Sequence, residues 1–84
     1  MANLTLDNAA PRKNFRPTTT IPRAKARLAG KPNPTLKVTK KNATVPVFNG
    51  PIGSDDQNLP QLEDGETYTA EATLAANQNI TLSY

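Results

Sequence analysis

The chain contains no cysteine, no histidine and no tryptophan, and only four aromatic residues among 84. Without cysteine there is no disulfide, and without cysteine and histidine the common zinc ligand sets are excluded. The same absences remove the thiol nucleophile and the usual base of covalent catalysis, and the sequence has no P-loop or dinucleotide fingerprint. We therefore expect no enzyme activity and no cofactor or metal site, and interpret the chain as a binding or scaffold protein.

Acidic residues cluster in one segment, where calcium is the metal to consider. Oxygen ligands of this kind are what calcium prefers, but the EF-hand spacing is missing. We therefore interpret the cluster as solvated charge. Its members are Asp55, Asp56, Glu63, Asp64 and Glu66.

Large apolar residues are also few. Residues 35–84 hold thirteen of them, which makes a thin core. Small chains with so little core usually add disulfides, a metal or association with other chains. Because the first two are excluded, we expect a homo-oligomer, a dimer or trimer, or tight binding to another protein. No apolar run approaches the length of about 18 residues that a membrane span requires, so no membrane partner is expected.

Charge is divided unevenly along the chain. Residues 1–41 hold all ten bases and one acid, Asp7, for a net charge of +9. Residues 42–84 hold six acids and no base, for a net charge of −6. Such a separation indicates an electrostatic role for at least one half.

The basic half is rich in proline, with five of the eight prolines in residues 11–34. Proline fixes φ and removes a backbone donor, so this spacing disfavours both a long helix and a central strand. The best local helix is Arg23–Ala29, which is only about two turns long. We predict that residues 1–34 form an extended basic arm that orders on a partner, a solvated tail being the alternative. The side chains expected to contact that partner are Leu4, Leu6, Arg12, Lys13, Phe15, Arg16, Ile21, Arg23, Lys25, Arg27, Leu28 and Lys31.

Residues 35–84 show the period-two alternation of strands. The clearest runs are Thr35–Lys41, Thr67–Leu74 and Asn79–Tyr84, the last two forming a predicted hairpin through a turn at residues 75–78. Alanine and leucine also permit a helix over Ala70–Ala76, but the alternating threonines favour the strand. The residues expected on the core or oligomer face are Tyr68, Leu74, Ile80, Leu82 and Tyr84.

Two weaker strands complete the predicted fold. Thr44–Phe48 contains Pro46 and so fits an edge strand or bulge, followed by a turn at Asn49-Gly50. Residues 4–6 can add a short strand to an edge. We predict a mostly β fold: a small β-sandwich or sheet of four to five short strands (residues 35–84) with a long extended N-terminal arm (residues 1–34).

The whole pattern resembles the small capsid decoration, or cement, proteins of tailed bacteriophages. The resemblance lies in the Pro/Arg segments Pro11–Pro17 and Arg23–Arg27, in the Thr/Ala-rich run Glu66–Leu74, and in the absence of Cys, His and Trp. It implies a structural virion protein on the capsid surface, present in the host cytoplasm during assembly. The implied partner is the major capsid (coat) protein, whose subunits the basic arm bridges while the β half faces solvent or forms the oligomer contact.

Two other classes stay open. A small nucleic-acid-binding or ribosome-associated protein would place the basic arm on phosphates, although Phe15 is the only aromatic residue in that arm. A host-surface or glycan-binding module would need clustered aromatic residues, and Phe48, Tyr68 and Tyr84 are few for that purpose.

Overall fold

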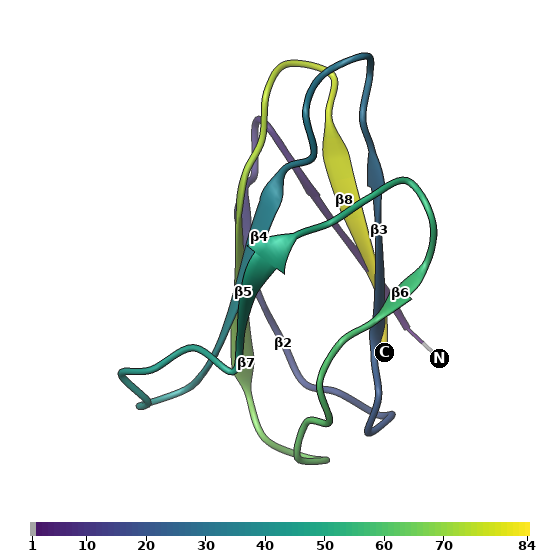
Figure 1. Ribbon diagram of the computed structural model, residues 1–84. Helices are drawn as coiled ribbons and strands as arrows, with labels where there is room; N and C mark the ends of the chain where they lie inside the picture. Colours follow the sequence, from purple (N-terminus) through teal and green to yellow (C-terminus); the bar gives the residue numbers. More distant parts are fainter. Residues whose placement is uncertain (1) are drawn as a thin grey trace.

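The computed structural model describes residues 2–84, which form two antiparallel four-stranded sheets packed face to face (Figure 1). Sheet A has the strand order β1-β8-β3-β6 and sheet B the order β2-β7-β4-β5. The predicted small β-sandwich is thus confirmed, with eight strands in place of four to five. The strands are β1 (Asn3–Asp7), β2 (Arg12–Phe15), β3 (Arg23–Arg27), β4 (Thr35–Lys40), β5 (Phe48–Pro51), β6 (Gln57–Asn58), β7 (Tyr68–Thr73) and β8 (Asn79–Ser83).

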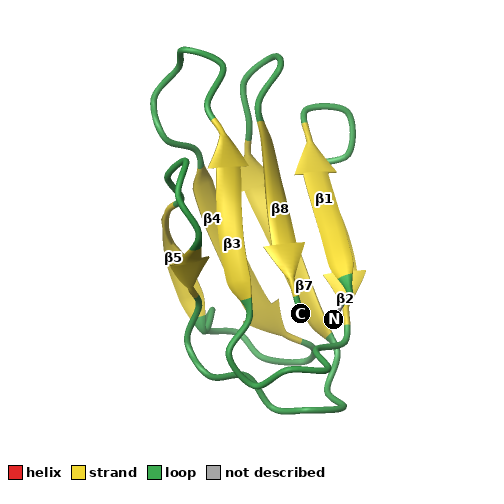
Figure 2. Ribbon diagram, turned by 90° about the vertical axis from the view of Figure 1, so that its right-hand side faces the viewer, coloured by secondary structure: helices red, strands yellow, loops and turns green. Residues whose placement is uncertain are grey.

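The strand pairing is nested along the chain. β1 pairs with β8, β2 with β7, β3 with β6 and β4 with β5, so the chain is one long hairpin folded over on itself. Two further pairings, β3 with β8 and β4 with β7, join these strand pairs into the two four-stranded sheets. This is the jelly-roll arrangement, in which two sheets share the strands of interlocked Greek keys. Figure 2 shows sheet A in front with sheet B behind it.

Alternation of side chains explains the strands that the sequence predicts. In β4, Leu36 and Val38 are fully buried while Lys37 is exposed. Tyr68 and Ala70 of β7 are buried in the same way, as the period of two requires. Predicted strands over residues 35–41, 67–74 and 79–84 are confirmed, as is the short strand around residues 4–6.

The core lies between the two sheets and includes residues from both halves of the sequence. Its aromatic part is Phe15 of β2, whose ring centroid lies 5.9 Å from that of Tyr68 and 5.1 Å from that of Tyr84. The Tyr68 hydroxyl accepts a hydrogen bond from the backbone N–H of Glu63 at 2.9 Å, so its polar end is satisfied. The buried apolar residues are Leu6, Phe15, Ala24, Ala26, Leu36, Val38, Ile52, Leu59, Leu62, Tyr68, Ala70, Ile80 and Leu82.

The structure does not show the long N-terminal arm that the sequence analysis predicts. β1 and β3 lie on either side of β8 in sheet A, and β2 is an edge strand of sheet B. Residues before and after position 34 therefore contribute to each sheet. The prolines lie in or beside the connections, because Pro11 precedes β2, Pro22 precedes β3 and Pro34 precedes β4. They mark strand boundaries, where a missing backbone N–H breaks no ladder.

The segment Arg23–Ala29 is also corrected, from a short helix to strand β3. Its alanines, Ala24 and Ala26, are buried, and its cations point to solvent. Period-two burial decides the conformation here, because tertiary packing overrides the helix propensity of alanine.

Two predicted turns are wrong. β7 and β8 lie in different sheets, so residues 74–78 cross from one sheet to the other and do not close a hairpin. Asn49 and Gly50 lie inside β5, and the strand expected over Thr44–Phe48 is shifted to Phe48–Pro51. Residues 41–47 instead form a loop that protrudes from the body of the sandwich (Figure 1).

Candidate interaction surfaces

Three cations form a row on the outer face of sheet A. Residues opposite each other on antiparallel strands share a face, and β3 pairs Arg23 with Ser83, Lys25 with Thr81 and Arg27 with Asn79. The next strand continues these rows with Asn3, Thr5 and Asp7. We call Arg23, Lys25 and Arg27 the basic row; its members lie about 6.6 Å apart along the strand, twice the rise per residue.

The basic row has no acidic partner in the part of the chain that the structure describes. All three residues are exposed, and none makes an ion pair or a side-chain hydrogen bond. Among the strand residues of this face the acid is Asp7, two strands away in β1, and Asp56 directly precedes β6 on the other side of β3. The Asp7 carboxylate accepts the backbone N–H groups of Ala9 and Ala10 at 3.0 and 2.8 Å and so shapes the β1–β2 turn.

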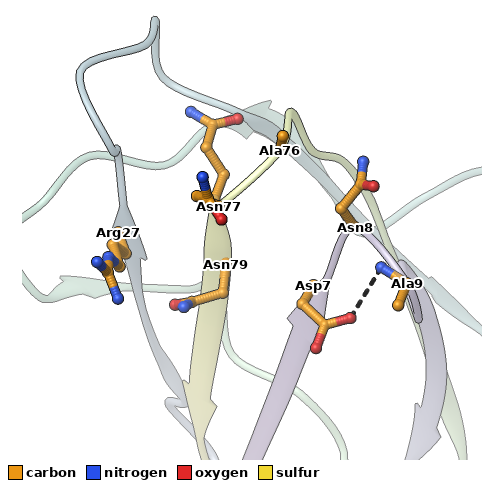
Figure 3. A pocket seen from close by; sticks show the side chains of 8 residues that line it. Asp7, Asn8, Ala9, Arg27, Ala76, Asn77 and Asn79 are labelled. Carbon is orange, nitrogen blue, oxygen red and sulfur yellow. Dashed lines mark hydrogen bonds between the residues drawn. The ribbon is translucent and has the colours of Figure 1, made fainter.

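A shallow hollow of about 460 Å³ opens at one end of this face, between the β1–β2 and β7–β8 turns (Figure 3). Arg27 from β3 and Asp7 from β1 flank it, and Asn79 of β8 lies between them. Amide side chains of Asn8 and Asn77 complete a polar lining. The hollow extends the basic row with groups that donate and accept hydrogen bonds.

The outer face of sheet B has charges of both signs. Glu71 of β7 lies between Arg12 of β2 and Lys37 of β4, and its carboxylate is 3.4 Å from the Arg12 guanidinium. The pair is largely exposed, so it contributes about 0–1 kcal/mol at most. This face therefore offers less uncompensated charge than the basic row.

A second ion pair ties one end of β4 to the β6–β7 loop. The Lys40 ammonium donates to the Glu63 carboxylate, and this hydrogen bond raises the pKa of Lys40 above its usual value. Nearby negative charge on Glu63 and Glu66 acts in the same direction.

The apolar residues expected to contact a partner lie mostly in the chain's own core. Leu6 and Phe15 are buried, and Leu4 and Leu28 are partly buried against the core. Ile21 alone is largely exposed, at 51%. The residues predicted for the core or oligomer face all belong to the core or pack against it: Tyr68, Leu74, Ile80, Leu82 and Tyr84.

The predicted basic residues are spread over different surfaces. Arg23, Lys25 and Arg27 come together in the basic row, whereas Arg12 lies on the outer face of sheet B. The remaining three, Lys13, Arg16 and Lys31, are exposed on β2 or in loops.

Sequence reasoning predicted the strands β8 and β1 but did not place their Asn, Thr and Ser residues beside the basic row. The alternation in Arg23–Arg27 was the signal that could have found this face, because it places every cation on one side of a strand. The exposed Val45 and Val47 of the protruding β4–β5 loop were not predicted as surface residues either.

Among residues 2–84, no group of three acidic side chains lies close enough together to hold a metal ion. The described residues form no helix that could cross a membrane. Comparisons with family models, with curated proteins and with solved structures find no match to this chain.

Proposed function

We propose that this chain is a non-enzymatic structural virion protein that decorates an assembled capsid and cements its coat subunits. The observation that carries the proposal is the basic row, three exposed cations on one strand without an acidic partner among the described residues. In this proposal the contact lies on the outer face of sheet A and no longer on an N-terminal arm. The partner is an acidic surface of the major capsid protein.

A rigid strand suits this task. Arg23, Lys25 and Arg27 are held at fixed spacing by the β3–β8 ladder, so binding orders the side chains but not the backbone. Each exposed ion pair contributes only about 0.2–1 kcal/mol. Strong attachment therefore needs several pairs per copy and many copies per particle, as a symmetric shell provides.

A protein partner is favoured over nucleic acid or glycan by the placement of the aromatic rings. Base and sugar binding normally use exposed aromatic faces. Here Phe15 and Tyr68 are buried, and Phe48 and Tyr84 pack against the core, so within residues 2–84 no aromatic ring lies on the basic face. Jelly rolls serve both as capsid and as lectin domains, so the proposal rests on the charged face and not on the architecture.

The test is capture of partners by the tagged full chain from its native source, with half of each sample treated with nuclease. We expect an abundant coat protein in a fast-sedimenting particle, bound equally in both halves and released by raised salt. The variant R23E/K25E/R27E should lose it. The matched control K13E/K31E/K41E changes the net charge equally but leaves the basic row intact, and should retain it.

Two outcomes would contradict the proposal. Loss of the partner in the nuclease-treated half would assign the basic row to phosphates. Equal loss in both triple variants would mean that net charge, and not this face, drives attachment.

A further inference from the structure

The sandwich has four edge strands: β1 and β6 in sheet A, β2 and β5 in sheet B. An edge strand presents unpaired N–H and C=O groups that another strand can bind. Proteins prevent such pairing with very short edge strands, with proline, or with a charged residue that points inward at the edge.

Three of the four edges carry one of these devices. β6 has only two residues and is soon followed by Pro60. β5 follows Pro46 and ends at Pro51. β2 places Lys13 opposite the buried Ala70, and so on the inward side of sheet B.

β1 carries none of them. It is five residues long, contains no proline, and its inward-facing residues are Leu4 and Leu6. Leu6 is fully buried, whereas Leu4 remains partly exposed beside the edge. β1 is thus the one edge, within the described chain, that is open to another strand.

The free backbone groups of this edge follow from the ladder. Ala2 and Tyr84 exchange two hydrogen bonds, and such pairs alternate along antiparallel strands. Leu4 and Leu6 therefore also bond to β8, while Asn3, Thr5 and Asp7 direct their N–H and C=O groups outward. Asp7 exchanges its pair with Ala10 at 3.2 and 3.1 Å, which leaves Asn3 and Thr5.

We infer that β1 binds β1 of a second copy of this chain, antiparallel, about a two-fold axis at Leu4. In this register Asn3 of one copy opposes Thr5 of the other. The two residues exchange both backbone hydrogen bonds, four in all by symmetry, so every free group of the edge is used. The two Leu4 side chains face each other as a non-hydrogen-bonded pair, the closer kind, and cover each other's exposed surface.

The charges of the chain permit this register. The two Asp7 residues lie at opposite ends of the new ladder, about 20 Å apart along the strands. The basic rows of the two copies are separated by β8 and β1 of each copy, or about 24 Å at the usual strand spacing. Both distances exceed the Debye length of about 10 Å at moderate salt. Pairing therefore joins two sheets A into one eight-stranded face, with the two Asp7 residues and the two basic rows well apart.

The dimer also fits the small core of the chain, since association is the stabilising route open to a domain without disulfides or metal. The inference does not depend on the proposed capsid function, because it rests on the edge and not on the basic row. In sheet B, Lys13 prevents the equivalent pairing of β2, so the expected assembly is a dimer and not a fibre.

The first test is amide hydrogen exchange of the full chain, followed by NMR over a concentration series. In the dimer the N–H groups of Asn3 and Thr5 should become at least tenfold more protected as concentration rises. The outward N–H groups of Arg12 and Asn14 on β2 provide the internal control and should stay fast. Protection that is independent of concentration, or that rises on β2, would overturn the inference.

The second test removes one donor. Thr5→Pro deletes an N–H that the chain itself does not use, so the β1–β8 hydrogen bonds remain, while Thr5→Val keeps the donor. Sedimentation equilibrium should show the dissociation constant raised at least tenfold for Thr5→Pro and nearly unchanged for Thr5→Val. A dimer of wild-type strength in Thr5→Pro would contradict pairing through β1.

Discussion

The side-chain amide of Gln78 donates a hydrogen bond to the backbone carbonyl of Pro32 at 2.8 Å. The same nitrogen is 3.2 Å from the carbonyl oxygen of Leu28, and the side-chain oxygen accepts the N–H of Ala75 at 2.8 Å. Gln78 is 96% buried and is the buried polar residue among the described side chains. It fastens the β7–β8 turn to the β3–β4 connection, at the end of the sandwich where the polar hollow opens.

Replacing Gln78 by alanine should therefore be costly for a polar substitution. The Pro32 carbonyl and the Ala75 N–H would lose this partner, whereas the Leu28 carbonyl still accepts the N–H of Lys31. Each group left unsatisfied costs about 1–3 kcal/mol unless water reaches it. We expect the free energy of unfolding in urea to fall by about 2–3 kcal/mol. Gln61→Ala, at an exposed position, is the control and should change it by less than about 0.5 kcal/mol. Equal effects of the two changes would show that the bridge does not matter.

The N-terminal residues are part of the fold, and this is directly measurable. Leu6→Ala removes a fully buried side chain of β1, so we expect a loss of about 2–5 kcal/mol. Ile21→Ala, at a largely exposed site, should cost far less. Denaturant unfolding of both variants provides the comparison. A tolerated Leu6→Ala would instead support an arm detached from the core.

The turn before β7 depends on glycine. Gly65 has a φ of +82°, a conformation that a β-carbon disfavours, although no atom lies within 4 Å of the added carbon. Gly65→Ala should therefore lower stability by about 1 kcal/mol through backbone strain alone. Gly53→Ala is the matched control, because its φ lies outside that region and its nearest contact would be an ordinary one at 3.7 Å. In thermal unfolding, Gly65→Ala should have a lower melting temperature than Gly53→Ala.

The Lys40–Glu63 pair should make the stability of the fold depend on pH in the alkaline range. Because the hydrogen bond to Glu63 raises the pKa of Lys40 in the folded state, folding favours the protonated lysine. This contribution is complete below the usual lysine pKa and is lost as pH rises through the raised folded value. The melting temperature of Lys40→Met should accordingly fall less steeply than that of the wild type above about pH 10.

The pair is exposed, so this effect is small and needs a matched comparison. Lys41→Met removes an equal charge at the neighbouring exposed position, where the described chain shows no ion pair. The melting temperature of Lys41→Met should fall with rising pH as steeply as that of the wild type. Identical slopes for Lys40→Met and the wild type would remove Glu63 as the cause.

Period-two alternation with large apolar residues was enough to predict β4, β7 and β8, since Leu36, Tyr68 and Ile80 each begin a buried face. It failed for β3, because Ala24 and Ala26 carry little hydrophobic signal and favour helix in isolation. Their burial comes from packing between sheets, which no local window contains. β6 has only two residues, too few for any periodicity.

The prolines of residues 11–34 lie at strand boundaries and do not form a continuous arm. Their spacing in residues 11–34 predicts a continuous extended arm, yet the intervals Pro11–Pro17 and Pro22–Pro32 each hold one strand, β2 and β3. Pro17, Pro22 and Pro34 are buried at strand ends, where a fixed φ suits a change of direction. Sequence alone also could not place β7 and β8 in different sheets, because partner choice depends on strands far away along the chain.

The basic row was predicted only as a set of residues and not as a surface. Composition identified Arg23, Lys25 and Arg27 as unusual, but their common face required the strand assignment. The alternation in residues 79–84 predicts that Thr81 and Ser83 share a face, but not that this face lies beside β3.

The nested pairing of strands has a consequence for how the chain is made. The β4–β5 pair is the only one between consecutive strands within residues 2–84, so it is the first that can close while the chain is being synthesised. β8 occupies an interior position in sheet A, between β1 and β3. β1 and β3 are therefore synthesised before their partner β8, and Leu6 of β1 remains uncovered until β8 follows. Folding of such long-range pairs is slow, and the waiting strands have exposed edges that make crowded synthesis prone to aggregation.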